Sequence, residues 1–123
     1  MSGFVRVNVP TSSGVYEILT SKIQDKDRVK PYLVTIHDVA HNFFTNFCYI
    51  HDNFIFDQLI DAFTMININI LGQEPGAPEV SSNVPYPSYS AIATNVHEII
   101  EYFNIREFIG LGVSTHSFFF IFF

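Results

Sequence analysis

Polar and apolar residues alternate at the start of the chain. Three valines within residues 5–9 are separated by Arg6 and Asn8, a period of two that is typical of a β-strand with one buried face. The turn-forming run Thr11–Gly14 follows, and an extended pattern resumes over Val15–Leu19. The pattern therefore predicts a β-hairpin.

Three short apolar runs predict buried strands: Tyr32–Ile36, Met65–Leu71 and Phe108–Gly112. Each is too short for a typical helix. Apolar residues at helical spacing over Phe56–Phe63 predict a helix between the first and second runs. Strands that alternate with helices indicate a parallel sheet whose faces the helices cover. We therefore expect an α/β fold in which an N-terminal hairpin precedes a partial parallel sheet with flanking helices.

The most strongly patterned helix lies between residues 88 and 104. Its apolar positions recur at helical spacing and predict the face that packs on the sheet: Ile92, Val96, Ile99, Ile100 and Phe103. Glu98 and Glu101 fall outside this face, so we expect both in solvent. Ser88 or Ser90 can cap the start of the helix, and Asn104 suits its end.

Two loops are expected at the carboxyl edge of the sheet. His37–Asn46 follows the first parallel strand, and Gly72–Ser88 follows the second and contains four prolines, which forbid regular structure. Unstructured loops as long as Gly72–Ser88 are usually functional, and open α/β sheets bind ligands at this edge. These loops are the candidate binding surface.

Composition and charge narrow the class of protein. With 48% hydrophobic residues and 14 Phe, the 123-residue chain can build a core, although catalytic doubly wound domains usually need more residues. A net charge of -6 argues against nucleic-acid binding.

The apolar run Phe108–Phe123 is shorter than the ~20 residues that span a bilayer. The single Cys48 and the absence of an apolar signal-peptide core predict a cytoplasmic protein.

Ser114 follows a predicted buried strand, at the place of the nucleophile in a Gly-x-Ser-x-Gly elbow. Gly112 supplies the first glycine, but His116 stands where the closing glycine is needed for tight packing. The acid and base of such a triad come later in the chain, and the nine residues after Ser114 offer only His116. A turn serine is therefore the favoured interpretation, and a hydrolase completed by further sequence is the alternative.

His37 and Asp38 end the first parallel strand, where a hydrolase of this fold places the loop that donates an oxyanion-hole N–H. The simpler interpretation is structural, with His37 held by neighbouring backbone and Asp38 capping the loop. A metal site built from His37, His41 and His51 is weaker still, because the first two would share a face only in a helix. We expect no metal and no cofactor.

Four segments together resemble the N-myc downstream-regulated (NDRG) family: Lys30–Val39, Gly72–Pro78, Tyr86–Ser88 and Ile109–Val113. The resemblance extends over roughly Phe4 to Phe118. It implies an α/β-hydrolase fold without hydrolase activity, in cytoplasmic proteins that act through protein partners in differentiation, growth and stress responses. Residues 1–123 would then form a single, partial NDRG-like domain without its C-terminal half.

The chain departs from the family's pattern at several positions. Ser114 and His116 stand where the family has glycine, Asn69 replaces an acidic residue, Leu71 a proline and Ala40 a glycine. We therefore expect a non-catalytic scaffold or binding protein, with a serine hydrolase and a non-functional truncated fragment as the alternatives.

Self-association is a further expectation. The strand Phe108–Gly112 would lie at an open edge of the partial sheet, which is a template for pairing between molecules. Residues 118–123 add six apolar side chains without charge or proline, a composition that favours aggregation.

Overall fold

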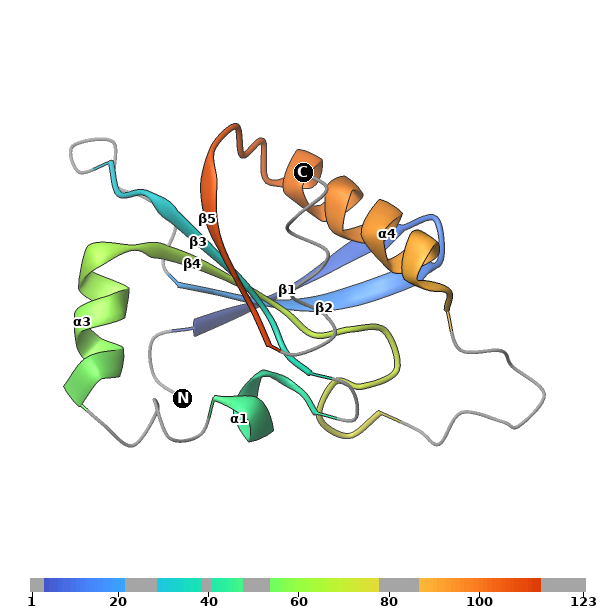
Figure 1. The fold of residues 1–123 in the computed structure, drawn as a ribbon, viewed down its shortest axis with the longest axis horizontal. Coiled ribbons are helices and arrows are strands. Elements are labelled where there is room, and N and C mark those ends of the chain that lie inside the picture. Colours follow the sequence, from blue (N-terminus) through green and yellow to red (C-terminus); the bar gives the residue numbers. More distant parts are fainter. Residues whose placement is uncertain (1–3, 22–28, 39–40, 48–53, 78–86, 114–123) are drawn as a thin grey trace.

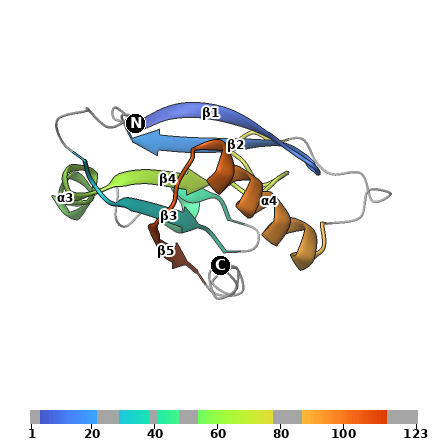
Figure 2. The ribbon, with the colours of Figure 1, turned by 90° about the horizontal axis from the view of Figure 1, so that it is seen from above.

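The computed structural model describes residues 4–21, 29–38, 41–47, 54–77 and 87–113. Their five strands form one mixed sheet in the order β1-β2-β4-β3-β5, seen from two directions in Figures 1 and 2. The expected α/β architecture, a hairpin joined to a partial parallel sheet, is confirmed.

The hairpin consists of β1 (Phe4–Thr11) and β2 (Gly14–Ser21), paired antiparallel from Phe4 opposite Ser21 to Thr11 opposite Gly14. Gly14 adopts φ 144°, and a Cβ atom there would lie 3.2 Å from a methyl group of Leu71. The backbone angle therefore favours glycine at this corner, and a Cβ atom would in addition have to displace the Leu71 side chain slightly.

The parallel part of the sheet consists of β3 (Tyr32–Ile36), β4 (Thr64–Ile68) and β5 (Phe108–Gly112). β3 lies at its centre, and β4 also pairs antiparallel with β2. β4 ends three residues before the predicted end at Leu71. The chain turns away here because the carbonyl of Ile70 accepts the Gln73 N–H at 2.9 Å, a contact within the loop instead of along the ladder.

Helices cover both faces of the sheet (Figure 1). On one face lies α4 (Tyr89–Tyr102), capped by Ser88, and it buries Ile92, Val96, Ile99 and Ile100 against the sheet. On the other face lie α1 (Phe43–Asn46) and α3 (Phe54–Ala62). Phe43 and Phe47 pack there with Leu19, Leu33 and Met65. The predicted packing face of α4 is confirmed.

Two expectations about exposure and regularity are wrong. The segment His37–Asn46 is not all loop, because Asn42 and Thr45 form a reciprocal capping box that starts the single turn of α1. A four-residue helix is too short to show periodicity in the sequence. β5 is also not buried: 54% of Ile109 and 40% of Leu111 is exposed, because β5 is the last strand of the described sheet.

The tip of the hairpin is hydrogen-bonded to α4. The N–H and the hydroxyl of Ser12 donate to the two carboxylate oxygens of Glu98 at 2.8 and 2.6 Å. The buried Asn95 accepts a hydrogen bond from the Tyr16 hydroxyl at 2.9 Å. Glu98 is thus not simply in solvent, as the helical pattern alone suggested, because the hairpin tip folds over its side of α4.

The Ser12–Glu98 contact should make stability depend on pH. The Ser12 hydroxyl holds the pKa of Glu98 below its ordinary value of 4.5. A carboxyl group with a lowered folded-state pKa stabilises the fold fully above its unfolded pKa, and this stabilisation is lost as the pH falls through the folded value. We expect Glu98→Gln to lower the free energy of unfolding near neutral pH, and the difference from wild type to shrink below pH 4.5. Urea melts across this range measure both.

Glu107→Gln is the matched control, since Glu107 is an exposed carboxylate just before β5. This variant should follow the pH dependence of the wild type. An identical difference between wild type and Glu98→Gln at neutral and acid pH would show that the Glu98 carboxylate contributes nothing through its charge.

Candidate functional site

His37 lies at the carboxyl end of β3 and is fully buried. The Ile70 N–H donates to its Nε2 at 2.9 Å, and its Nδ1 lies 2.8 Å from the carbonyl oxygen of Asp38. Because Nε2 accepts a hydrogen bond, the proton is assigned to Nδ1, which donates to that carbonyl. The imidazole therefore links the end of β3 to the segment that follows β4.

Asp38 is held through its backbone. Its N–H donates to Oδ1 of Asn46 at 2.5 Å, and its carbonyl accepts the His41 N–H at 3.2 Å. The side chain of Asn46, at the end of α1, thus closes the loop back onto its start. The Asp38 N–H is the backbone group nearest to where an oxyanion-hole donor would lie, and it already donates to Asn46.

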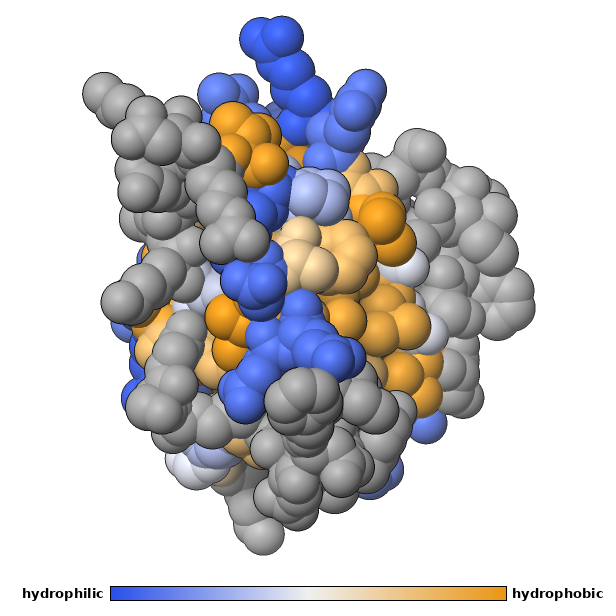
Figure 3. All heavy atoms as spheres, turned by 90° about the vertical axis from the view of Figure 1, so that its left-hand side faces the viewer, coloured by the Kyte–Doolittle hydropathy of each residue, from blue (hydrophilic) through white to orange (hydrophobic). Residues whose placement is uncertain are grey.

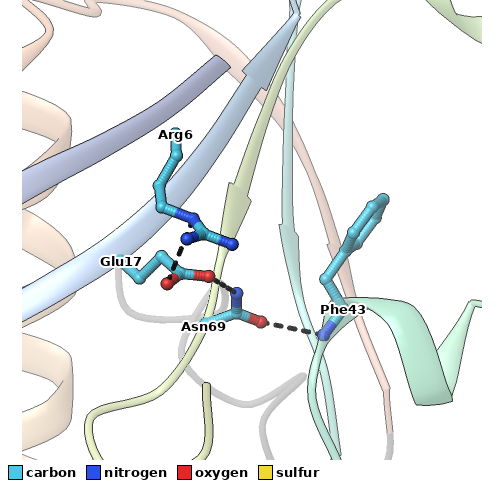
Figure 4. Close-up of polar contacts among 4 residues, drawn as sticks. All are labelled: Arg6, Glu17, Phe43 and Asn69. Carbon is cyan, nitrogen blue, oxygen red and sulfur yellow. Dashed lines mark hydrogen bonds and ion pairs between the residues drawn. The ribbon is translucent and has the colours of Figure 1, made fainter. Parts of the chain in front are cut away.

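A second polar group joins β1, β2, the end of β4 and the start of α1 (Figure 4). The buried Asn69 side chain donates to Glu17 Oε1 at 3.2 Å and accepts the Phe43 N–H at 2.8 Å. Arg6 Nε lies 3.4 Å from Glu17 Oε2. An amide suits this position because it both donates and accepts, whereas an ionised acid only accepts.

Other residues of the candidate site lie outside the described part of the chain. These are Ser114, His51 and His116, together with segments 39–40 and 78–86 of the candidate loops. In the described start of the second loop, Glu74 accepts the Gly72 N–H at 2.9 Å and the Ala77 N–H at 3.0 Å. Pro75 and Gly76 are exposed at this turn.

The arrangement of His37 and Asp38 suits support of the fold more than proton transfer. The Nε2 lone pair that a general base would use already accepts a backbone hydrogen bond. His41 is exposed, and its Nδ1 lies 3.3 Å from the Thr45 hydroxyl. Within the described ranges, no three His, Cys, Asp or Glu side chains converge as metal ligands would.

A hollow of about 300 Å³ lies at the opposite end of the sheet. Its lining includes Tyr32 and Thr64, which begin β3 and β4, and Tyr102 at the end of α4. It does not coincide with the loops that the sequence marks as the candidate binding surface.

Sequence reasoning missed Glu17 and Asn46 as members of this site. The signal for Glu17 was present, since strand alternation places it on the same face as Leu19, which is buried. An acid on an inward strand face needs a partner. For Asn46 there was no such signal, because its contact with Asp38 depends on the turn of α1.

Asn69→Asp tests the Glu17–Asn69 contact. The substitution replaces the NH₂ group with an oxygen and sets two carboxylates against each other in a buried place, so we expect a loss of about 2–4 kcal/mol near neutral pH. Part of this loss should be recovered in acid, when one carboxyl group is protonated. Urea melts at both pH values provide the measurement.

The double variant Glu17→Gln/Asn69→Asp is the control for that experiment. In this variant the amide is at position 17 and the carboxylate is at position 69, so one side chain again donates and the other accepts. The variant should therefore recover much of the lost stability. If the double variant is as unstable as the sum of the two single variants, the two side chains do not interact.

The fold resembles solved α/β hydrolase-type structures. A hydrolase from Pseudomonas aeruginosa PA01 matches with a TM-score of 0.61 at 16% identity, covering 93% of this chain and 38% of that one. An AqdC variant, described as recognising and cleaving the ring of the Pseudomonas quinolone signal, matches with a TM-score of 0.67 at 12% identity, covering 95% and 39%. At these identities the likeness shows the fold alone.

Sequence relatives are more specific. Protein NDRG3 of Xenopus tropicalis is 27% identical over 117 residues, covering 90% of this chain and 28% of that protein. Protein NDRG2 of Bos taurus is 28% identical over 89 residues, covering 72% and 25%. The chain thus spans less than a third of the length of these relatives. The model of the Ndr family matches residues 7–123, and the chain therefore belongs to the Ndr family.

Proposed function

We propose that this chain is a non-catalytic binding module of the Ndr family, acting in the cytoplasm through protein contacts in differentiation, growth or stress signalling. It would form one partial α/β-hydrolase-like domain. The observation that carries the proposal is at the carboxyl edge of the sheet. There the polar groups of His37 and Asp38 bond to the chain's own backbone and to Asn46.

This hydrogen bonding argues against hydrolysis for two reasons. A general base must keep a lone pair for the nucleophile's proton, and an oxyanion hole must keep N–H groups directed at the developing charge. In this chain the Nε2 of His37 accepts from Ile70, and the Asp38 N–H donates to Asn46.

None of the helices in the described part of the chain has the length and apolarity needed to cross a membrane.

The protein contacts are assigned to the two loops at the carboxyl edge. His41, Pro75 and Gly76 are exposed there, while the backbone beneath them is held by Asn46 and Glu74. A surface whose underlying loops are fixed by hydrogen bonds loses less conformational entropy on binding. Solvent-exposed loops supported in this way are suited to recognition of another protein.

A serine-directed fluorophosphonate probe tests the non-catalytic part of the proposal. We expect the folded chain to show no labelling above that of Ser114→Ala, because a serine hydroxyl without a general base is a weak nucleophile near neutral pH. Stoichiometric labelling that disappears in Ser114→Ala would establish the hydrolase alternative instead.

Quantitative affinity capture tests the binding part. The variant His41→Ala/Pro75→Ala should lose proteins that the wild type retains, since it alters both exposed loops. The matched control is Gln58→Ala/Arg106→Ala, which changes two exposed residues outside these loops. If every retained protein is held equally by both variants, the carboxyl-edge loops are not the contact surface.

A further inference from the structure

One buried imidazole holds the starts of both carboxyl-edge loops. His37 is fully buried and follows the last residue of β3. Its Nδ1 donates to the carbonyl of Asp38 at 2.8 Å, in the first loop. Its Nε2 accepts the N–H of Ile70 at 2.9 Å, where the chain leaves β4 for the second loop. Of these two contacts, only the one at Nε2 requires the ring to be neutral.

The two contacts therefore respond differently to protonation. A charged imidazole carries a proton on both nitrogens, so it donates twice and accepts nothing. The Nδ1 contact survives this change, because the Asp38 carbonyl is an acceptor. The Nε2 contact is lost, because the Ile70 N–H is itself a donor. Ile70 is fully buried, and a buried N–H without an acceptor is costly.

The turn after β4 depends on the position of Ile70. The Ile70 carbonyl accepts the Gln73 N–H at 2.9 Å, so a movement of Ile70 also disturbs this turn. The residue before it is held separately, since the Asn69 N–H donates to the Glu17 carbonyl at 3.2 Å. The side chain of Ile70 packs in the core beneath α4, which makes the open form a minor state at neutral pH. A local opening can thus begin at Ile70 and leave β4 paired.

We propose that His37 makes the second carboxyl-edge loop sensitive to acid: protonation of its Nε2 favours release of the segment that begins at Ile70, while the segment that begins at Asp38 stays in place. In the open form the ring meets water and takes up a proton in the ordinary histidine range, near pH ~6.5. Acid therefore favours the open form through the proton that it binds. Pro75 and Gly76 follow this segment, so any consequence for partner binding rests on the proposed function.

The charged groups around His37 define the pH range of the test. Carboxylates near the ring favour its charged form, whereas burial and the Ile70 N–H oppose it. Carboxyl groups ordinarily titrate near pH ~4, so mainly histidines change charge between pH 5 and pH 7. α1 and β5 carry no titratable side chain. The titratable side chains on the other described elements around the carboxyl edge are Glu17 of β2, Asp38 and His41 beside His37, Glu74 after β4, and His97, Glu98 and Glu101 of α4.

Amide hydrogen exchange of the full chain, expressed as protection relative to an unstructured peptide at the same pH, tests the proposal. If opening takes up one proton at an ordinary histidine, the Ile70 amide should lose protection about 25-fold between pH 7 and pH 5. The Asn46 amide, which donates to the Asn42 carbonyl at 3.0 Å in the first loop, should keep its protection.

The opposite end of the sheet provides the internal reference for global unfolding. There α3 leads into β4, at the end of the molecule that faces the viewer in Figure 3. The Thr64 N–H donates to the Pro31 carbonyl at 3.0 Å at this end. Its protection should stay constant between pH 7 and pH 5, because His37 lies at the other end of β3.

Two substitutions of His37 separate its charge from its hydrogen bond. In His37→Gln the amide oxygen reaches the place of Nε2 and accepts the Ile70 N–H without titrating, so Ile70 should stay protected at both pH values. In His37→Asn the shorter side chain does not reach Ile70, which should be poorly protected at both. His41→Gln and His97→Gln each remove an exposed histidine and should keep the pH dependence of the wild type. Circular dichroism checks that each variant is folded.

The ¹⁵N signals of the His37 ring provide a second measurement that needs no variant. They should report a neutral ring with its proton on Nδ1 at pH 7, and the closed form should keep this state at pH 5, where an exposed histidine is charged. A charged ring in a chain whose Ile70 amide is still protected would contradict the proposal.

Three results of the exchange experiment would also overturn it. One is protection of Ile70 that stays constant between pH 7 and pH 5. Another is an unchanged pH dependence in His37→Gln, which would assign the effect to a different histidine, for instance His51 or His116. The third is an equal loss at Ile70, Asn46 and Thr64, because acid would then unfold the whole domain. Exchange is measured without a partner, so the acid response and the proposed binding function can fail separately.

Discussion

A sheet built around parallel strands must be covered on both faces and closed or protected at both edges, and this requirement organises the whole molecule. β3 lies between β4 and β5, and its residues from Leu33 to Ile36 are buried. α4 covers one face, and α1 with α3 covers the other. Among the described strands, β1 and β5 are outermost: β1 carries polar residues, and β5 consists of apolar residues and glycine.

Where the strands end, their backbone groups need new partners, and side chains at the carboxyl edge provide them. His37 accepts the Ile70 N–H, Asn69 accepts the Phe43 N–H, and Asn46 accepts the Asp38 N–H. Buried N–H groups without partners are costly. In a hydrolase of this fold the same edge carries reacting groups, whereas in the described part of this chain these three side chains support the backbone.

Membership of the Ndr family and likeness to hydrolase structures rest on different kinds of similarity. The hydrolase structures share the arrangement of strands, at identities that show no more than that. The family relatives share residues along most of the chain. The proposed absence of catalysis is argued from the hydrogen bonds at the carboxyl edge, which are independent of any relative.

The sequence by itself determined the strands and the longer helices, because these depend on local periodicity, whereas the single turn of α1 left no such pattern. The valine alternation of the hairpin, the short run Tyr32–Ile36 and the apolar stripe of α4 each appear in the structure within a residue or two. Asn104, predicted to end α4, adopts the left-handed φ of 53° that such an end requires.

Only the tertiary structure decided which polar side chains meet. The Ser12–Glu98 contact joins residues 86 apart, and Asn69 reaches Glu17 across 52; neither pairing leaves a local pattern. The exposure of β5 was likewise decided by its place in the sheet, since an apolar run reads the same whether its strand is central or at an edge. Local periodicity indicates which face of a segment must be buried, whereas the choice of partner depends on how all the segments pack together.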